Sequence, residues 1–153
     1  MTSVPEPPGT GSGAVAADDP STLLGGSVRV LALESFRDHR GSLTPMTLDV
    51  LGFQVARTFV VSAPPGAVRG GHAHRRVRQV LFRASGTIDV DVSHRGERHR
   101  VTLDGERPAM LIEPGVWAQQ TYLDDATLIV FADGPYEPAE YADGDSGTDQ
   151  GTA

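Results

Sequence analysis

Short apolar runs separated by turn-forming residues dominate the central part of the chain. In several runs apolar and polar residues alternate, which is the pattern of a strand with one buried face. Gly, Pro, Asp and Ser stand between the runs, and no segment keeps a helical period for long. The pattern predicts strands at Val28–Leu33, Gln54–Val61, Val77–Ala84, Thr87–Val92, Glu97–Leu103, Ala109–Ile112 and Thr127–Phe131.

This succession of strands predicts an all-β domain. Short strands with turns every few residues are typical of a sandwich or a closed barrel. The segment Ser93–Gly96 lies between two predicted strands and has the composition of a hairpin turn. With 153 residues, of which 39% are hydrophobic, the chain can bury one core. We therefore expect a single folded domain over residues 27–142.

The two ends differ in composition from the central region. Residues 1–26 are rich in Pro, Gly, Ser and Ala, and residues 143–153 are acidic and rich in Gly. We expect both to be disordered tails, because they lack the apolar residues needed for a core. The opening lacks the cationic start and apolar run of a secretion signal, and no later stretch has the length of a membrane span. We expect a cytoplasmic protein with no membrane partner.

The formal net charge of -7 conceals an uneven distribution. All 13 basic residues are arginines between Arg29 and Arg107, whereas six of the 20 acidic residues lie in the predicted tails. The central region is therefore almost neutral, which argues against nucleic acid as a partner. The absence of lysine excludes a lysine Schiff base, and the absence of cysteine excludes a thiolate nucleophile, a disulfide and a thiolate metal site.

The segment Gly66–His74, with its His-x-His pair, carries the most specific chemistry in the chain. Side chains of an extended segment alternate between two faces, so His72 and His74 point to the same side. Two polar rings that face a barrel interior cost free energy unless they are used or paired. We interpret them as acid–base groups. The remaining histidines, His39, His94 and His99, are interpreted as surface or structural residues.

The spacing of this segment, with Gln79 and Gly86 after it, resembles the first sequence motif of the cupin superfamily. The resemblance implies a jelly-roll barrel. Gln79 stands where that motif normally carries a Glu, and Ala118 stands where a later strand usually supplies a third His ligand. Two imidazoles and a neutral amide are a poor ligand set for zinc, iron or manganese. We therefore expect no metal and no other cofactor.

A longer series of motifs narrows the resemblance. It runs from Val30 to Tyr141 and comprises Asp38–Leu43, Arg57–Phe59, Arg69–His74, Gln79–Leu81, Val101–Asp104, Pro114–Trp117 and Pro135–Tyr141. As a set, in this order, these segments resemble the dTDP-sugar 3,4-ketoisomerases. Those enzymes are metal-independent cupins that rearrange dTDP-4-keto-6-deoxyglucose in deoxysugar biosynthesis.

The resemblance implies an isomerase that moves the ketone of the sugar from C4 to C3 through an enediolate. It places His72 and His74 at the reacting sugar, and we assign His72 as the base and His74 as the donor or second acid–base group. Arg57 and Arg69 are the candidates for the diphosphate. Further candidates for substrate binding are Gln79, Trp117 and Gln119. The resemblance also implies a homodimer and a dTDP-linked 4-keto-6-deoxy sugar as the ligand.

The chain departs from the family pattern at several positions. Phe59 and Val60 stand where a Tyr usually follows the Arg that matches Arg57, and Ala118 stands in place of a His. Thr47 replaces a Glu that is often found there. The missing phenol and imidazole remove two proton carriers. An altered product, a slower enzyme or a pocket that only binds therefore remain alternatives.

Other functions and simpler roles stay open. The alternatives to the isomerase are a 3,5-epimerase-like cupin and a non-catalytic cupin that binds a sugar nucleotide, with a metal-dependent oxygenase as a more distant one. Among the remaining side chains, Arg75, Arg76 and Arg78 are interpreted as a solvated turn and strand face. Tyr136 and Tyr141 are interpreted as anchors of the last strand or of a subunit contact.

Overall fold

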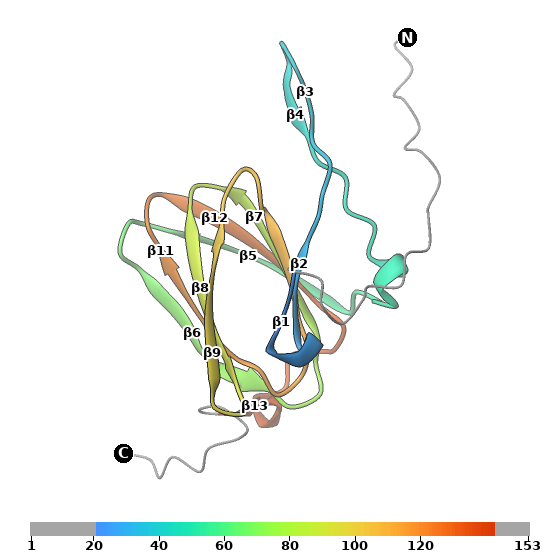
Figure 1. Ribbon diagram of the computed structural model, residues 1–153, viewed down its shortest axis with the longest axis vertical. Coiled ribbons are helices and arrows are strands. Elements are labelled where there is room, and N and C mark those ends of the chain that lie inside the picture. Colours follow the sequence, from blue (N-terminus) through green and yellow to red (C-terminus); the bar gives the residue numbers. More distant parts are fainter. Residues whose placement is uncertain (1–20, 143–153) are drawn as a thin grey trace.

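The protein consists mainly of two facing antiparallel β-sheets, as seen in a computed structural model that describes residues 21–142 (Figure 1). The six-stranded sheet has the order β1-β2-β10-β7-β12-β5, and the five-stranded sheet has the order β13-β6-β11-β8-β9. A third, two-stranded hairpin projects from the body of the barrel. This arrangement is a jelly-roll barrel of the cupin type, and the predicted all-β fold is confirmed.

The strands are divided among the two large sheets and the hairpin. The six-stranded sheet contains β1 (Thr22–Leu23), β2 (Val28–Leu31), β10 (Ala109–Ile112), β7 (Gln79–Ser85), β12 (Ala126–Ala132) and β5 (Arg57–Ala63). The five-stranded sheet contains β13 (Tyr141–Ala142), β6 (Val68–His74), β11 (Trp117–Tyr122), β8 (Ile88–His94) and β9 (Glu97–Leu103). The projecting hairpin is formed by β3 (Phe36–Asp38) and β4 (Gly41–Leu43).

Helical structure within residues 21–142 is limited to three short 3₁₀ segments. They are η1 (Leu24–Gly26), η2 (Asp49–Leu51) and η3 (Pro138–Glu140). Among these described residues, no helix has the length and apolar character needed to cross a bilayer.

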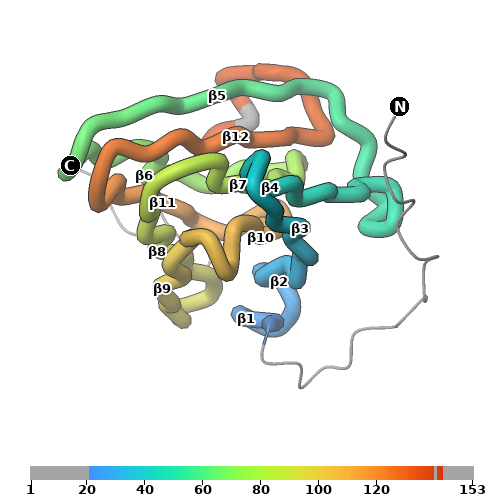
Figure 2. The backbone as a smooth tube through the Cα atoms, turned by 90° about the horizontal axis from the view of Figure 1, so that it is seen from above, coloured from blue at the N-terminus to red at the C-terminus, as the bar shows by residue number. Residues whose placement is uncertain are grey.

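The main hydrophobic core fills the space between the two sheets, which Figure 2 shows from above. A second, smaller core lies on the other face of the six-stranded sheet, where Phe53 and partly buried residues near it cover the strands. Strand β10 contributes to both cores. Met110 and Ile112 belong to the core between the sheets, and Ala109 and Leu111 belong to the second. Because side chains alternate along a strand, the residues that belong to the main core mark the inner face of each sheet.

All seven strands predicted from the sequence are present, with ends shifted by a few residues. The predicted turn at Ser93–Gly96 connects β8 to β9, although β8 itself extends to His94. Strand β11 was not predicted. Its sequence, Trp-Ala-Gln-Gln-Thr-Tyr, places polar residues on both faces, so that apolar alternation does not reveal it.

Regular structure is present in residues 21–26, before the predicted domain boundary at residue 27. Thr22 and Leu23 of β1 pair with Arg29 and Val28 of β2, and Leu24 is buried in the main core. The prediction of a disordered tail over residues 1–26 is therefore wrong for residues 21–26. Backbone pairing, which composition does not report, orders this segment. The remainder of the predicted tails, 1–20 and 143–153, lies outside the described residues.

Arg78 is a structural residue, which corrects its interpretation as part of a solvated face. Its guanidinium donates to the carboxylate of Glu113 at 3.0 to 3.2 Å and to the carbonyl oxygens of Leu51 and Gly52 at 3.2 Å. The Arg78 side chain is only 21% exposed. It ties the segment before β5 to the end of β10. Arg75 and Arg76, by contrast, are exposed as predicted.

A β-bulge lies in strand β6 just before the two histidines. His72 pairs with Ala118 of β11, whereas Gly70 pairs with Gln119, so Gly71 has no residue opposite it. Gly70 and Gly71 have φ angles of +82° and +84°, a region that side-chain-bearing residues rarely adopt. A Cβ atom on Gly70 would lie 2.9 Å from the carbonyl oxygen of Ala118. The bulge therefore requires glycine at position 70.

The bulge also decides which side chains face the interior. Residues directly opposite each other on paired strands share a face of the sheet. Ala118 belongs to the core between the sheets, so His72, which pairs with it, lies on the inner face. Gln120 shares that face and pairs with Arg69, which therefore also lies on the inner side of β6. The extra residue thus places Arg69 on the same face as the two histidines.

We predict that Gly70→Ala destabilises the protein more than Gly66→Ala does. Gly66 has a similar φ of +84°, but a Cβ atom there would have nothing within 4 Å. The backbone strain alone costs about 1 to 2 kcal/mol at either position, and only Gly70→Ala adds a contact with the backbone of β11. Urea denaturation should show a lower free energy of unfolding for Gly70→Ala. Equal losses in the two variants would contradict this account of the bulge.

Candidate active site

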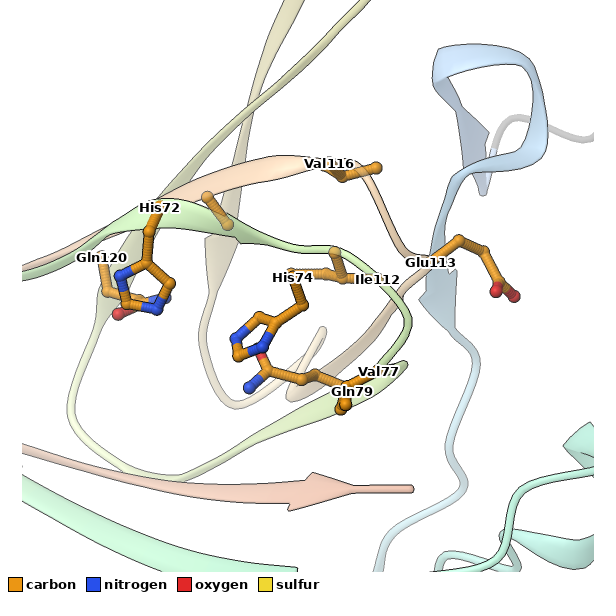
Figure 3. Close-up of a pocket in the computed structure, with 9 residues that line it drawn as sticks. His72, His74, Val77, Gln79, Ile112, Glu113, Val116 and Gln120 are labelled. Carbon is orange, nitrogen blue, oxygen red and sulfur yellow. The ribbon is translucent and has the colours of Figure 1, made fainter. Parts of the chain in front are cut away.

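A cavity lies inside the barrel against the inner faces of β6, β7 and β11 (Figure 3). Its empty volume is about 290 Å³, including the open mouth. The lining residues are His72, His74, Val77, Gln79, Ile112, Glu113, Val116, Ala118 and Gln120. The four positions that correspond to the cupin ligand spacing, namely His72, His74, Gln79 and Ala118, therefore meet at one cavity.

The two predicted histidines lie side by side on the cavity wall. Their ring centroids are 5.3 Å apart and their planes meet at 72°. Figure 3 shows the Gln79 side chain reaching toward His74 and the Gln120 side chain beside His72. The end of the strand is fixed by the Gly115 amide, which donates to the His74 carbonyl oxygen at 2.7 Å. The spacing allows both imidazoles to contact one small ligand.

Tyr141 contacts both imidazoles, although the sequence predicted only an anchoring role for it. Tyr141 in β13 pairs directly with His74 across the sheet edge. Its ring centroid lies 4.5 Å from that of His72 and 4.8 Å from that of His74. The anchoring role is compatible with this pairing, but the ring contacts place Tyr141 within the candidate site.

Arg57 lies on the inner face of β5, at the start of the strand. Its guanidinium carbon is 4.7 Å from the centroid of the Phe59 ring and 5.1 Å from that of Tyr136. Phe59 packs against the main core, whereas Val60 is 62% exposed on the other face. Of the two positions considered for the missing family tyrosine, only Phe59 therefore faces the barrel interior.

Arg69 lies farther along β6, beyond the bulge from the histidines, and is exposed. It is close enough to Tyr122 for its charge to act on that phenol. Burial raises the pKa of Tyr122, and the positive charge of Arg69 partly opposes the increase. The Tyr122 hydroxyl is buried and makes no hydrogen bond within the described part of the chain. Arg69 and Arg57 thus approach the barrel interior from different strands, β6 and β5.

Trp117 and Gln119 are not brought together with the histidines. They line a separate, open hollow with an empty volume of about 930 Å³, together with Asp91, Arg98 and other residues of β8 and β9. Along β11, both residues point to the opposite side from Ala118 and Gln120. They therefore lie on the outer face of the five-stranded sheet. Their predicted contact with substrate stays a prediction. A ligand in the histidine cavity would meet Gln120 instead.

The other polar groups near the cavity have structural partners. Glu113 is paired with Arg78, and its carboxylate points away from the imidazoles in Figure 3. The Nδ1 atom of His94 lies 3.2 Å from the Gly115 carbonyl oxygen, which fits its predicted structural role. His39 and His99 are exposed. Within residues 21–142, no three His, Cys, Asp or Glu side chains are grouped so as to hold a metal ion.

Comparison with known proteins agrees with the predicted resemblance. The model of the family described as "FdtA: WxcM-like, C-terminal" matches residues 26–146. A TDP-4-oxo-6-deoxy-alpha-D-glucose-3,4-oxoisomerase from Aneurinibacillus thermoaerophilus is 26% identical over 116 residues, which are 74% of this chain and 84% of the relative. The enzyme class is that of an isomerase, as predicted.

Solved structures support the fold. A sugar 3,4-ketoisomerase from Thermoanaerobacterium thermosaccharolyticum, in complex with TDP, superimposes with a TM-score of 0.69 at 23% identity, covering 76% of this chain and 87% of that chain. A 3'-monoepimerase from Streptomyces bikiniensis, in complex with dTDP-quinovose, gives a TM-score of 0.68 at 23% identity, with coverages of 76% and 69%. The fold alone therefore does not separate isomerase from epimerase. The family match, which spans most of the sequence, shows that the chain belongs to the FdtA family of WxcM-like C-terminal domains.

Proposed function

We propose that this protein is a nucleotide-sugar 3,4-ketoisomerase that converts dTDP-4-keto-6-deoxyglucose to a 3-keto product without a metal ion, in deoxysugar biosynthesis. The observation that carries the proposal is the pair of imidazoles, 5.3 Å apart, on the wall of a cavity inside the barrel. The relative from Aneurinibacillus thermoaerophilus, whose name specifies this reaction, supports the choice of substrate.

The reaction needs one proton removed and one returned. In the proposed step His72 takes the proton from C3, and the electron pair of the broken bond forms the C3–C4 double bond while the C4 oxygen becomes an oxyanion. A proton is then delivered to C4 by an imidazole, and the proton of the C3 hydroxyl passes to the C4 oxygen. No atom is gained or lost. An imidazole suits both steps because its ordinary pKa lies near neutral pH.

The geometry favours proton transfer between adjacent carbons over inversion of a carbon centre. Inversion of a carbon requires one group to remove the proton and another to supply it from the opposite face of the sugar. His72 and His74 extend from the same face of one strand, so both rings approach a bound sugar from one side. This arrangement supports ketoisomerisation over the epimerase alternative.

Neutral and cationic side chains are available to bind the rest of the substrate. Gln79 and Gln120 line the cavity and supply amide donors, which stabilise an enediolate better in a water-poor site than in bulk solvent. Arg57 lies on the inner side of the neighbouring sheet and is our first candidate for the diphosphate, with Arg69 as the second. A TDP-linked ligand agrees with the TDP complex of the ketoisomerase with a similar fold.

The donor set at the cavity supports metal-independent chemistry. Gln79 offers only a neutral amide, and Ala118 offers no donor at the two remaining positions of the cupin ligand spacing. This donor set favours proton transfer by the imidazoles over coordination of a metal ion. A homodimer and a cytoplasmic location, both expected from the sequence, remain part of this proposal.

The direct test uses NMR of the reaction in deuterated water. Wild-type protein is incubated with freshly prepared dTDP-4-keto-6-deoxyglucose without added metal. We expect the carbonyl resonance to move from C4 to C3 and deuterium to enter C4 of the product. Deuterium at C3 and C5 with the ketone still at C4 would indicate the epimerase. Ligand binding with no exchange would indicate the non-catalytic alternative.

Replacement of the proposed base should abolish most of the activity. We expect His72→Asn to lower kcat by about 10²- to 10⁴-fold, the usual contribution of a general acid or base. His39→Asn is the matched control, because His39 is exposed in the projecting hairpin and should leave kcat unchanged. Full activity of His72→Asn, measured by the same NMR assay, would exclude His72 as the base.

Restoring the two missing ligands should create a metal site at the expense of isomerisation. The double variant Gln79→Glu, Ala118→His presents three imidazoles and a carboxylate at one cavity, a set that suits zinc. Calorimetry should detect stoichiometric Zn²⁺ binding to the variant at micromolar concentrations at which the native protein binds none. Zn²⁺ should also inhibit isomerisation by the variant, because it occupies the imidazole lone pairs. Equal Zn²⁺ affinity in the native protein would contradict the argument from the donor set.

A further inference from the structure

Tyr141 lies at the meeting point of a chain of aromatic contacts between the two sheets. Its ring touches the rings of both His72 and His74, and it also lies 5.8 Å from the ring of Tyr136. Tyr136 in turn lies under the guanidinium of Arg57 on β5. β5 and β13 are edge strands of the two different sheets. The contacts therefore connect the edges of both sheets on the side where the histidines lie.

The contacts with Tyr141 involve the faces and edges of the imidazoles. The Tyr141 and His72 rings meet at 73°, an edge-to-face arrangement, and the Tyr141 and His74 rings meet at 52°. An aromatic edge directed at a ring face is favourable and restricts rotation of both rings. The pairing of Tyr141 with His74 fixes the position of the tyrosine backbone relative to β6. One side chain thus contacts two imidazoles at once.

Two positions that carry polar side chains in the family are apolar in this chain. At the two family positions that carry a Tyr and a His, this chain has Phe59, which packs into the core, and Ala118, whose side chain is a single methyl group. Neither can hydrogen bond to an imidazole. Ala118 lies directly opposite His72 and presents only a methyl group to that side of the sheet. Tyr141 packs against the histidines from the other neighbouring strand, β13.

We infer that Tyr141 is a positioning residue whose aromatic ring holds His72 and His74 in the mutual orientation needed for proton transfer. This inference rests on the proposed function, since it concerns the same two imidazoles. It assigns the effect to the ring of Tyr141, which contacts the histidines, and makes the phenolic hydroxyl dispensable.

The test compares Tyr141→Phe, Tyr141→Leu and Tyr141→Ala. Tyr141→Phe keeps the ring and should retain kcat, whereas the other two should lower kcat at least about tenfold, because a small displacement of a catalytic group can cost about 10²-fold. KM should change little, since Tyr141 does not line the cavity. Thermal unfolding checks that each variant folds, and Tyr141→Leu retains apolar bulk in case Tyr141→Ala does not.

An NMR measurement on the protein without substrate gives a readout that does not depend on activity. We expect nuclear Overhauser contacts between the His72 and His74 ring protons in the native protein and in Tyr141→Phe, and their loss in Tyr141→Leu and Tyr141→Ala. Native protein that shows these contacts but does not isomerise the sugar would overturn the proposed function and leave the positioning role standing.

Three results would overturn the positioning role. The first is unchanged kcat together with unchanged ring contacts in Tyr141→Leu. The second is a loss of kcat in Tyr141→Phe as large as in Tyr141→Leu, which would assign the effect to the hydroxyl. The third is a lower KM with undiminished kcat in Tyr141→Ala, which would show that the ring obstructs the substrate.

Discussion

The bulge at Gly70 and Gly71 is the constraint on which the candidate site depends. In a regular ladder, β6 would continue past His72 with strict alternation, and Arg69 would face outward. The unpaired Gly71 breaks the alternation, so a cationic side chain and two imidazoles share the inner face of one strand. Backbone conformation, more than side-chain packing, makes this possible, because only glycine adopts these φ angles without strain. The arrangement of the candidate site therefore depends on two residues that have no side chain.

The same alternation explains how much of the site the sequence could predict. A period of two correctly placed His72 and His74 on one face, and the cupin spacing brought Gln79 to the same cavity. The prediction did not apply this two-residue alternation to β11. Ala118 was already taken as the position of a missing ligand, so the next inward residue is Gln120, whereas Gln119 faces the opposite way. Gln120 could have been found from the sequence.

Tyr141 illustrates the part of the site that local patterns cannot reveal. β13 contains only two residues, and its partner β6 lies more than sixty positions earlier in the chain. No periodicity is detectable over such a length, and the pairing is a long-range backbone contact. β1 is equally short, although its partner β2 is the next strand in the chain. Apolar alternation found seven strands because each of them buries a face in one of the cores. Short edge strands are held by backbone hydrogen bonds to a neighbouring strand. Backbone pairing of this kind produces little signal in the sequence of the edge strand.

The small number of titratable groups at the cavity limits the chemistry that it can perform. Among residues 21–142, Glu113 is the only carboxylate that lines it, and that charge is engaged by Arg78. In the proposed function, the two imidazoles are the proton carriers in the lining. A tautomerisation takes one proton from the substrate and returns one, so the pair ends each cycle with the protonation state in which it began. Reactions that consume or release a proton would need a further carrier to restore that state.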